Sequence, residues 1–146
     1  MTSQALALQD AAILAGMPRK NKWNKKAFRV QTEVKRVKWH NPRTGESGTY
    51  SEYGNASLHT RAYRELSREQ IMEIAQGIAR CGFNAHVYIN EDGEEPYTDF
   101  WADTDYHYEG TVSVMTIANG TVYQEREQVG VDENMKAQAW KRANSR

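Results

Sequence analysis

The sequence predicts an α+β domain, with an antiparallel sheet of about five to seven strands and a central helix packed on one face. Three observations support this class. Helical apolar spacing is confined to a few segments, strand-like alternation lies between them, and the segments follow the order helix, strands, helix, strands, helix. A parallel doubly wound fold would need more helices than these patterns supply.

The N-terminal segment has the apolar spacing of a short helix. We expect this helix to be capped by Ser3, to run to about Ala15 and to end at the stop signals Gly16 and Pro18. It is expected to dock against the domain or against a partner subunit. Residues 19–26 have no apolar periodicity and are interpreted as a basic linker.

A strand pattern begins after this linker. In a strand, every second side chain lies on the same face, and one face would contain Phe28, Val30, Thr32 and Val34. Val37 and Trp39 have the opposite parity, so a bulge near residues 35–36 would reconcile the two phases. Trp39 continues the parity of Val37, and we therefore expect it to be buried. The turn chemistry of 40–48 predicts a return strand at 49–53, and 58–66 is expected to form a third strand.

The central helix is predicted over about 67–81. Ser67 and Gln70 have the spacing of a capping box, and Gly82 is a stop signal. One apolar stripe contains Ile71, Ile74, Ala75 and Ile78. This stripe predicts a helix that buries one side in the core.

The second half of the chain predicts further strands and a last helix. Residues 83–89 alternate as a strand with one buried face. Asn119-Gly120, between strands at 111–118 and 121–129, predicts a hairpin with a type I′ turn. Asp132 is expected to begin a C-terminal helix that extends through 132–146.

At 146 residues the chain is expected to form a single domain, 1–146. The N-terminal helix and linker (1–26) and the C-terminal helix (132–146) are the candidates for mobile ends. Few aliphatic residues are available for a core, which favours a homo-oligomer. The single cysteine, Cys81, predicts a reducing, cytoplasmic environment, and the N-terminal apolar stretch is too short to suggest a membrane partner.

Charge is strongly segregated along a chain whose formal net charge is zero. Residues 19–43 contain ten Lys or Arg and one acid, whereas residues 91–109 contain eight acids and no Lys or Arg. Aromatic residues are interspersed in both segments. Basic side chains attract phosphate and aromatic faces can stack on bases, a combination typical of proteins that bind single strands.

These patterns predict a protein that binds single-stranded nucleic acid, DNA rather than RNA, with low sequence specificity and a role in replication or transcription control. No helix-turn-helix pattern supports recognition of a duplex. The candidate binding residues are Arg19, Lys20, Lys22, Trp23, Lys25, Lys26, Arg29, Arg36, Lys38, Trp140, Lys141 and Arg142. Past the suspected bulge, Arg36, Lys38 and His40 are expected to share one face as a basic stripe.

Two alternatives remain open at this stage. The acidic aromatic segment 91–109 can serve assembly between subunits, or it can bind a protein partner, including as a nucleic-acid mimic. If 103–109 is a strand, Asp103, Asp105 and His107 project from one face and would suit Mg²⁺ or Mn²⁺ in a nuclease. A solvated edge is the simpler interpretation. No catalytic residue and no cofactor is predicted, because the phosphate-binding glycine motifs are missing from the sequence.

Overall fold

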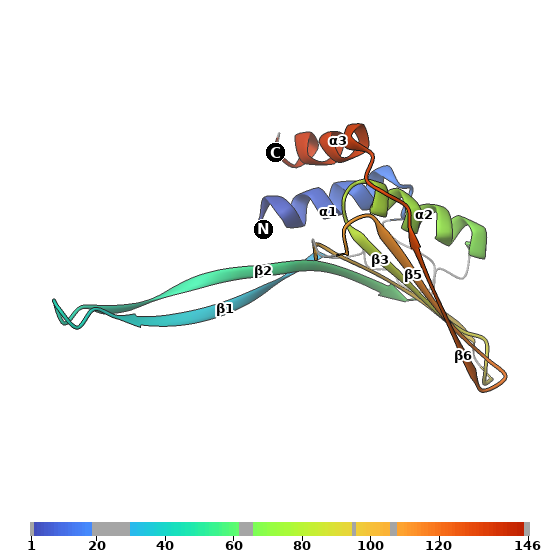
Figure 1. Cartoon of the computed structure of the whole chain (residues 1–146), viewed down its shortest axis with the longest axis horizontal. Coiled ribbons are helices and arrows are strands. Elements are labelled where there is room, and N and C mark those ends of the chain that lie inside the picture. Colours follow the sequence, from blue (N-terminus) through green and yellow to red (C-terminus); the bar gives the residue numbers. More distant parts are fainter. Residues whose placement is uncertain (1, 19–29, 62–65, 95, 106–107, 145–146) are drawn as a thin grey trace.

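The structure has the α+β architecture that the sequence predicts (Figure 1). It is a computed structural model that describes residues 2–18, 30–61, 66–94, 96–105 and 108–144. The helices within these ranges are α1 (Ser3–Leu14), α2 (Arg68–Arg80) and α3 (Glu133–Asn144). The strands are β1 (Val30–His40), β2 (Ser47–Arg61), β3 (Asn84–Asn90), β4 (Tyr97–Asp103), β5 (Thr111–Ala118) and β6 (Thr121–Gln128).

The strands form one sheet in the order β1-β2-β4-β3-β5-β6. Neighbouring strands are antiparallel except β3 and β5, which run parallel, so the sheet is mixed and not wholly antiparallel as expected. The path of the chain explains the difference. After β3 the chain turns back and forms β4, which lies between β3 and β2 and is antiparallel to both. Strand β5 lies along the other edge of β3 and runs in the same direction as β3.

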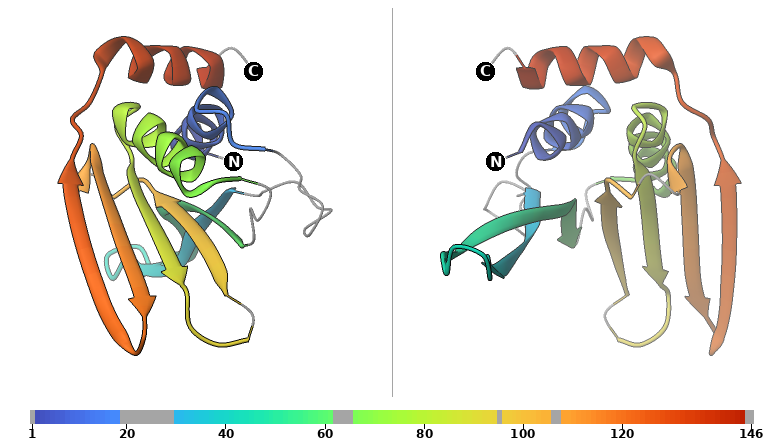
Figure 2. Two further views of the ribbon diagram at one scale, coloured as in Figure 1. Left: turned by 90° about the vertical axis from the view of Figure 1, so that its right-hand side faces the viewer. Right: turned by 60° about the vertical axis from the view of Figure 1, so that its left-hand side comes forward.

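The helices lie on one side of the sheet in two tiers, with α1 and α2 nearer the strands and α3 above α1 (Figures 1 and 2). Their core contains one side of each central strand: Leu58, Val87, Phe100 and Val112 are at most 1 % exposed. Helix α1 belongs to this core because Ala5, Ala7, Leu8, Ala11 and Ala12 are completely buried. Its N-cap is Thr2 and not Ser3, since the Thr2 hydroxyl accepts a hydrogen bond from the Ala5 N–H.

Local signals placed two elements correctly. The capping box of α2 is confirmed, because the Gln70 N–H donates to Ser67 Oγ and the Ser67 N–H donates to Gln70 Oε1. The hairpin between β5 and β6 is also confirmed, with φ of 52° at Asn119 and 73° at Gly120, as a type I′ turn requires. The carboxylate of Asp92 accepts hydrogen bonds from both N–H groups of this turn, at 2.6 and 2.7 Å.

Other boundaries differ from the predictions. The strand expected at 49–53 and residues 58–61 of the strand expected at 58–66 belong to one continuous strand, β2. This strand pairs with β1 along its first part and with β4 along its last part, and residues 62–65 lie outside the described residues. Strand β4 lies inside the acidic segment and ends at Asp103, and the described residues 104–105 and 108–109 are not in a strand, so the strand considered over 103–109 is wrong for these residues. Thr104 makes two hydrogen bonds with Ala56: the Ala56 N–H donates to Thr104 Oγ1, and the Ala56 carbonyl accepts from the Thr104 N–H.

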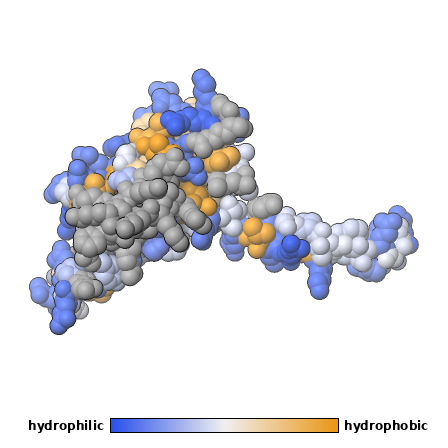
Figure 3. Space-filling model, turned by 180° about the vertical axis from the view of Figure 1, so that it is seen from behind, coloured by the Kyte–Doolittle hydropathy of each residue, from blue (hydrophilic) through white to orange (hydrophobic). Residues whose placement is uncertain are grey.

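The first part of the sheet extends away from the helices as a long two-stranded ribbon (Figures 1 and 3). We call residues 33–53 the arm. A bulge is present at its root, where Glu33 lies between paired Thr32 and Val34 while both Gly54 and Asn55 occupy the opposite position. The extra residue is therefore on β2, and the prediction of a bulge at residues 35–36 of the first strand is wrong.

The position of the bulge decides the exposure of Trp39. Because β1 itself alternates without interruption, Val34 and Trp39 project to opposite sides of the arm. Neither side is covered by a helix, and Trp39 is 42 % exposed, so the expectation that it is buried is wrong. Its indole ring lies over Gly48, where a Cβ would come within 3.0 Å of the ring.

Candidate nucleic-acid interface and polar sheet site

One side of the arm combines basic side chains with hydroxyl side chains. Residues directly opposite each other on paired strands project to the same side of a sheet. The pairs on this side beyond Val34 are Arg36 with Ser51, Lys38 with Thr49, and His40 with Ser47. The expectation that Arg36, Lys38 and His40 share a face is confirmed, and we call these three residues the basic stripe. Basic groups beside hydroxyl donors provide the chemistry that commonly contacts phosphate.

The opposite side of the arm has a different character. Its cross-strand pairs are Lys35 with Glu52, Val37 with Tyr50, and Trp39 with Gly48. Tyr50 is 47 % exposed and its hydroxyl donates to Glu52 Oε1, a hydrogen bond that raises the pKa of Tyr50. This side is therefore aromatic and has one cation facing one acid, so the positive charge of the arm is concentrated on the basic stripe.

The remaining candidate binding residues are not gathered with the stripe. Arg19, Lys20, Lys22, Trp23, Lys25, Lys26 and Arg29 lie outside the described residues. Trp140 is partly buried against the core, and the Arg142 Nε lies 3.8 Å from the completely buried carboxylate of Asp10. Lys141 is exposed on the same helix. Helix α1 separates α3 from the root of the arm, so Trp140, Lys141 and Arg142 lie apart from the basic stripe (Figures 1 and 2).

The sheet has a second polar surface on the side away from the helices, which we call the open face. Trp101 on β4 is 39 % exposed there, and its ring lies 5.7 Å from the imidazole of His86 on β3. The ring of Tyr88 also stacks against that imidazole, with centroids 6.4 Å apart. The pairing of β3 with β4 places His86 directly opposite Trp101 of the acidic segment.

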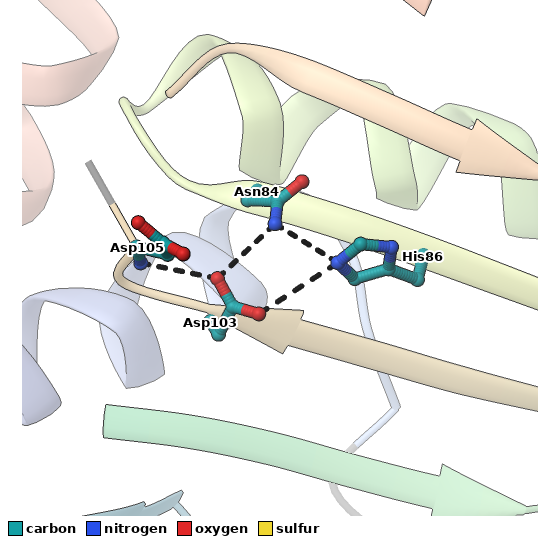
Figure 4. Close-up of polar contacts among 4 residues, drawn as sticks. All are labelled: Asn84, His86, Asp103 and Asp105. Carbon is teal, nitrogen blue, oxygen red and sulfur yellow. Dashed lines mark hydrogen bonds and ion pairs between the residues drawn. The ribbon is translucent and has the colours of Figure 1, made fainter. Parts of the chain in front are cut away.

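A hydrogen-bonded polar cluster lies on the open face where β3 begins and β4 ends (Figure 4). The Asn84 Nδ2 donates to Asp103 Oδ1 at 3.2 Å and lies 2.9 Å from His86 Nε2. The same His86 nitrogen is 3.7 Å from Asp103 Oδ2, and the Asp105 N–H donates to Asp103 Oδ1 at 3.0 Å. Burial alone would raise the pKa of the Asp103 carboxyl, but the nearby His86 imidazole and the hydrogen bonds from Asp105 and Asn84 together lower it.

This lowered pKa predicts a pH dependence of stability. Ionised Asp103 contributes fully above the unfolded-state pKa of about 3.9, and the contribution is lost as the pH falls through the lower native value. We expect Asp103→Asn to reduce the free energy of unfolding by about 1 kcal/mol at pH 7 and to flatten its decline on acidification. Urea denaturation at several pH values measures both effects, with exposed Glu91→Gln as the control. A decline as steep as in the wild type would contradict the prediction.

Several acids of the segment 91–109 have partners within the chain. Asp92 binds the β5–β6 turn, Asp103 anchors the polar cluster, and the Glu109 carboxylate accepts from Lys136 Nζ at 2.7 Å. The sequence offered no signal for most of these contacts, because Asn84, Lys136 and the β5–β6 turn are distant along the chain from the acids that they contact. The segment is thus partly built into the fold, and its surface charge is smaller than its composition indicates.

The polar cluster does not form an activated nucleophile or a metal site within the described residues. Ser113 lies beside His86 in the parallel β3–β5 register, but Ser113 Oγ makes no hydrogen bond to the imidazole or to any other described group. An activated serine requires that contact. No three His, Cys, Asp or Glu side chains in the described ranges are grouped to hold a metal ion, and the candidate ligand His107 lies outside those ranges.

Cys81 is a buried thiol at the end of α2. It is 1 % exposed, and burial together with the nearby charge of Asp132 raises its pKa to about 11. Because the thiolate is the reactive form, we expect native Cys81 to react with a disulfide reagent at pH 8 at least ~100-fold more slowly than the unfolded chain does. Stopped-flow absorbance with and without urea measures the two rates, and equal rates would exclude this protection.

Comparison with known proteins found no matching protein-family model, no matching curated protein and no matching solved structure. No helix in the described part of the chain is long and apolar enough to cross a membrane. The fold and the two surfaces define the class of this protein as an α+β domain with a projecting β-ribbon arm and a polar sheet face on the side away from the described helices.

Proposed function

We propose that this protein binds nucleic acid through its arm, with the basic stripe against the phosphate backbone and a preference for single strands. The observation that supports the proposal is the difference in charge between the two sides of the arm. Arg36, Lys38 and His40 have hydroxyl residues opposite them, whereas the cation on the other side, Lys35, has an acid opposite it. Arg36 and Lys38 are two cations with no acid opposite them, and such cations attract phosphate and release its counterions.

The shape of the arm supports a preference for single strands. A ribbon of two strands is narrow, and its aromatic side presents Trp39 and Tyr50, which are 42 % and 47 % exposed. A flexible strand can place phosphates along the basic stripe and pass around the edge of the ribbon to stack bases on these rings. A stiff duplex can contact only one side at a time, and so gains less from the aromatic side.

The direct test is a fluorescence-anisotropy titration of labelled oligonucleotides with the full chain, using single strands and duplexes of equal length at low and physiological salt. We expect tighter binding of single strands, affinity that falls steeply with salt, and little dependence on base sequence. Absence of binding at low salt would reject the proposal. Equal affinity for the two forms would reject the contribution of the aromatic side.

A second candidate function is supported by the apolar side chains of the arm. An isolated two-stranded ribbon is only marginally stable in water, and this one exposes Val34, Trp39 and Tyr50. The arm can therefore also hold copies of the chain together in a homo-oligomer. Sedimentation velocity decides this point: a monomer at tens of micromolar, unchanged by Trp39→Ser, would reject an assembly role.

A further inference from the structure

A small depression on the open face has the properties of a ligand site. Its volume is about 140 Å³, and it lies across β3, β5 and β6. Ser113 is directly opposite His86 on one neighbouring strand and Arg126 on the other. The side chains around the depression are His86, Tyr88, Ser113, Met115, Gln124 and Arg126. Ser113 is the smallest of them, so the longer neighbours stand around it as a rim.

The hydroxyl of Ser113 indicates that something polar belongs in this depression. Ser113 is only 7 % exposed, and its Oγ has no hydrogen-bond partner among the described residues. A buried hydroxyl that makes no hydrogen bond is unfavourable. A ligand that hydrogen-bonds to Ser113 Oγ would remove this cost.

The polar cluster orients a second donor toward the same place (Figure 4). Ionised Asp103 accepts from Asn84, and this requires the amide nitrogen of Asn84 to face Asp103. The same Nδ2 lies 2.9 Å from His86 Nε2, so in the neutral imidazole Nε2 accepts and Nδ1 carries the proton. In Figure 4 the second ring nitrogen of His86 lies on the side of the ring away from Asp103. Strand β5, with Ser113, neighbours β3 on that side.

The remaining donors make the depression electropositive. The guanidinium of Arg126 is held over the ring of Tyr108, 5.4 Å from its centroid, and Gln124 adds an amide. None of the described residues around the depression is an acid. Arginine, imidazole N–H, hydroxyl and amide donors together match the several acceptor oxygens of a tetrahedral oxyanion.

We propose that the depression around Ser113 binds a phosphate group, from a free nucleotide or from the end of a nucleic-acid strand. Ser113, His86 and Arg126 hold the phosphate oxygens, and Tyr88 lies beside them where a base or sugar would extend. Asn84 and Asp103 act as positioning residues, because they set which nitrogen of His86 donates. The site is separate from the arm and does not depend on the function proposed for it.

NMR titration of the ¹⁵N-labelled full chain tests this assignment, with inorganic phosphate and adenosine 5′-monophosphate as probes. We expect saturable shifts of the Ser113 amide and the His86 ring nitrogens at millimolar probe. Ser113→Ala and Arg126→Gln should each weaken the affinity about tenfold. Arg80→Gln removes one exposed charge at the end of α2 and should leave the affinity unchanged. Each substitution shortens or neutralises one side chain, and amide spectra without probe verify that the variants fold.

Shifts that do not saturate, or an affinity that Ser113→Ala and Arg126→Gln leave intact, would overturn the proposal. A third set of titrations distinguishes the two sources of phosphate with 5′-phosphorylated and unphosphorylated oligonucleotides. Stronger shifts at Ser113 with the phosphorylated strand assign the site to strand ends. Equal shifts, with binding of the mononucleotide retained, assign it to a free nucleotide. Loss of binding by the arm would not alter either readout.

Discussion

Replacing Arg36, Lys38 and His40 together by Gln is expected to weaken binding of single-stranded oligonucleotides about 30- to 100-fold at low salt. The physical reason is the loss of two cations, Arg36 and Lys38, which have no acid opposite them in the β1–β2 register, and of the His40 imidazole beside them. Each lost phosphate contact should also reduce the slope of log affinity against log salt by roughly 0.7 for single strands. Anisotropy titrations over a series of salt concentrations measure the affinity and the slope together.

The matched control changes charge on the arm without changing the stripe. Lys35 projects to the other side of β1, opposite Glu52, and Arg43 is an exposed residue beyond the end of β1. We expect the Lys35→Gln, Arg43→Gln variant to lose less than about threefold in affinity. If it loses as much as the triple variant, the net charge of the arm and not the stripe determines binding. Both variants change exposed side chains, so their melting temperatures should match the wild type.

Leu8→Ala is expected to reduce the free energy of unfolding by about 3 kcal/mol, the largest stability effect that we predict. Leu8 is completely buried in α1, among alanines that are also completely buried. Helix α1 lies between α3 and the sheet and also contacts α2, so a cavity at this position affects the packing of α2, of α3 and of the sheet. Urea denaturation followed by circular dichroism measures the change.

Leu14→Ala on the same helix is the control for Leu8→Ala. Leu14 is 38 % exposed, so its truncation removes less buried surface and should cost below about 1 kcal/mol. Equal losses for the two variants would show that α1 is not an integral part of the core. A large loss for Leu8→Ala alone would mean that the chain cannot fold stably without its N-terminal helix.

Elements with strong local signals could be predicted from sequence alone. The capping box of Ser67 and Gln70 starts α2, and the positive φ angles tolerated by Asn119 and Gly120 form the β5–β6 turn. Each signal depends on residues within a few positions of one another. The basic stripe is of the same kind, because strand alternation alone puts Arg36, Lys38 and His40 on one side.

Features that depend on distant neighbours could not be predicted in this way. Burial of Trp39 was expected from its parity, but parity selects a side of the strand and does not show whether another layer covers that side. The candidate phosphate site also depends on residues that are far apart in the sequence. It needs His86 between Asp103 on β4 and Ser113 on β5, and only the strand order makes these residues neighbours.

The sequence by itself determined the α+β class, the central helix, the final hairpin and the side of the arm on which Arg36, Lys38 and His40 lie. All of these follow from local conformational preferences and from the periods of helix and strand. Only the tertiary structure decided that β2 is one long strand, that β3 and β5 run parallel, and that the arm extends beyond the helices. These depend on which surfaces pack together, a choice made between segments far apart in the chain.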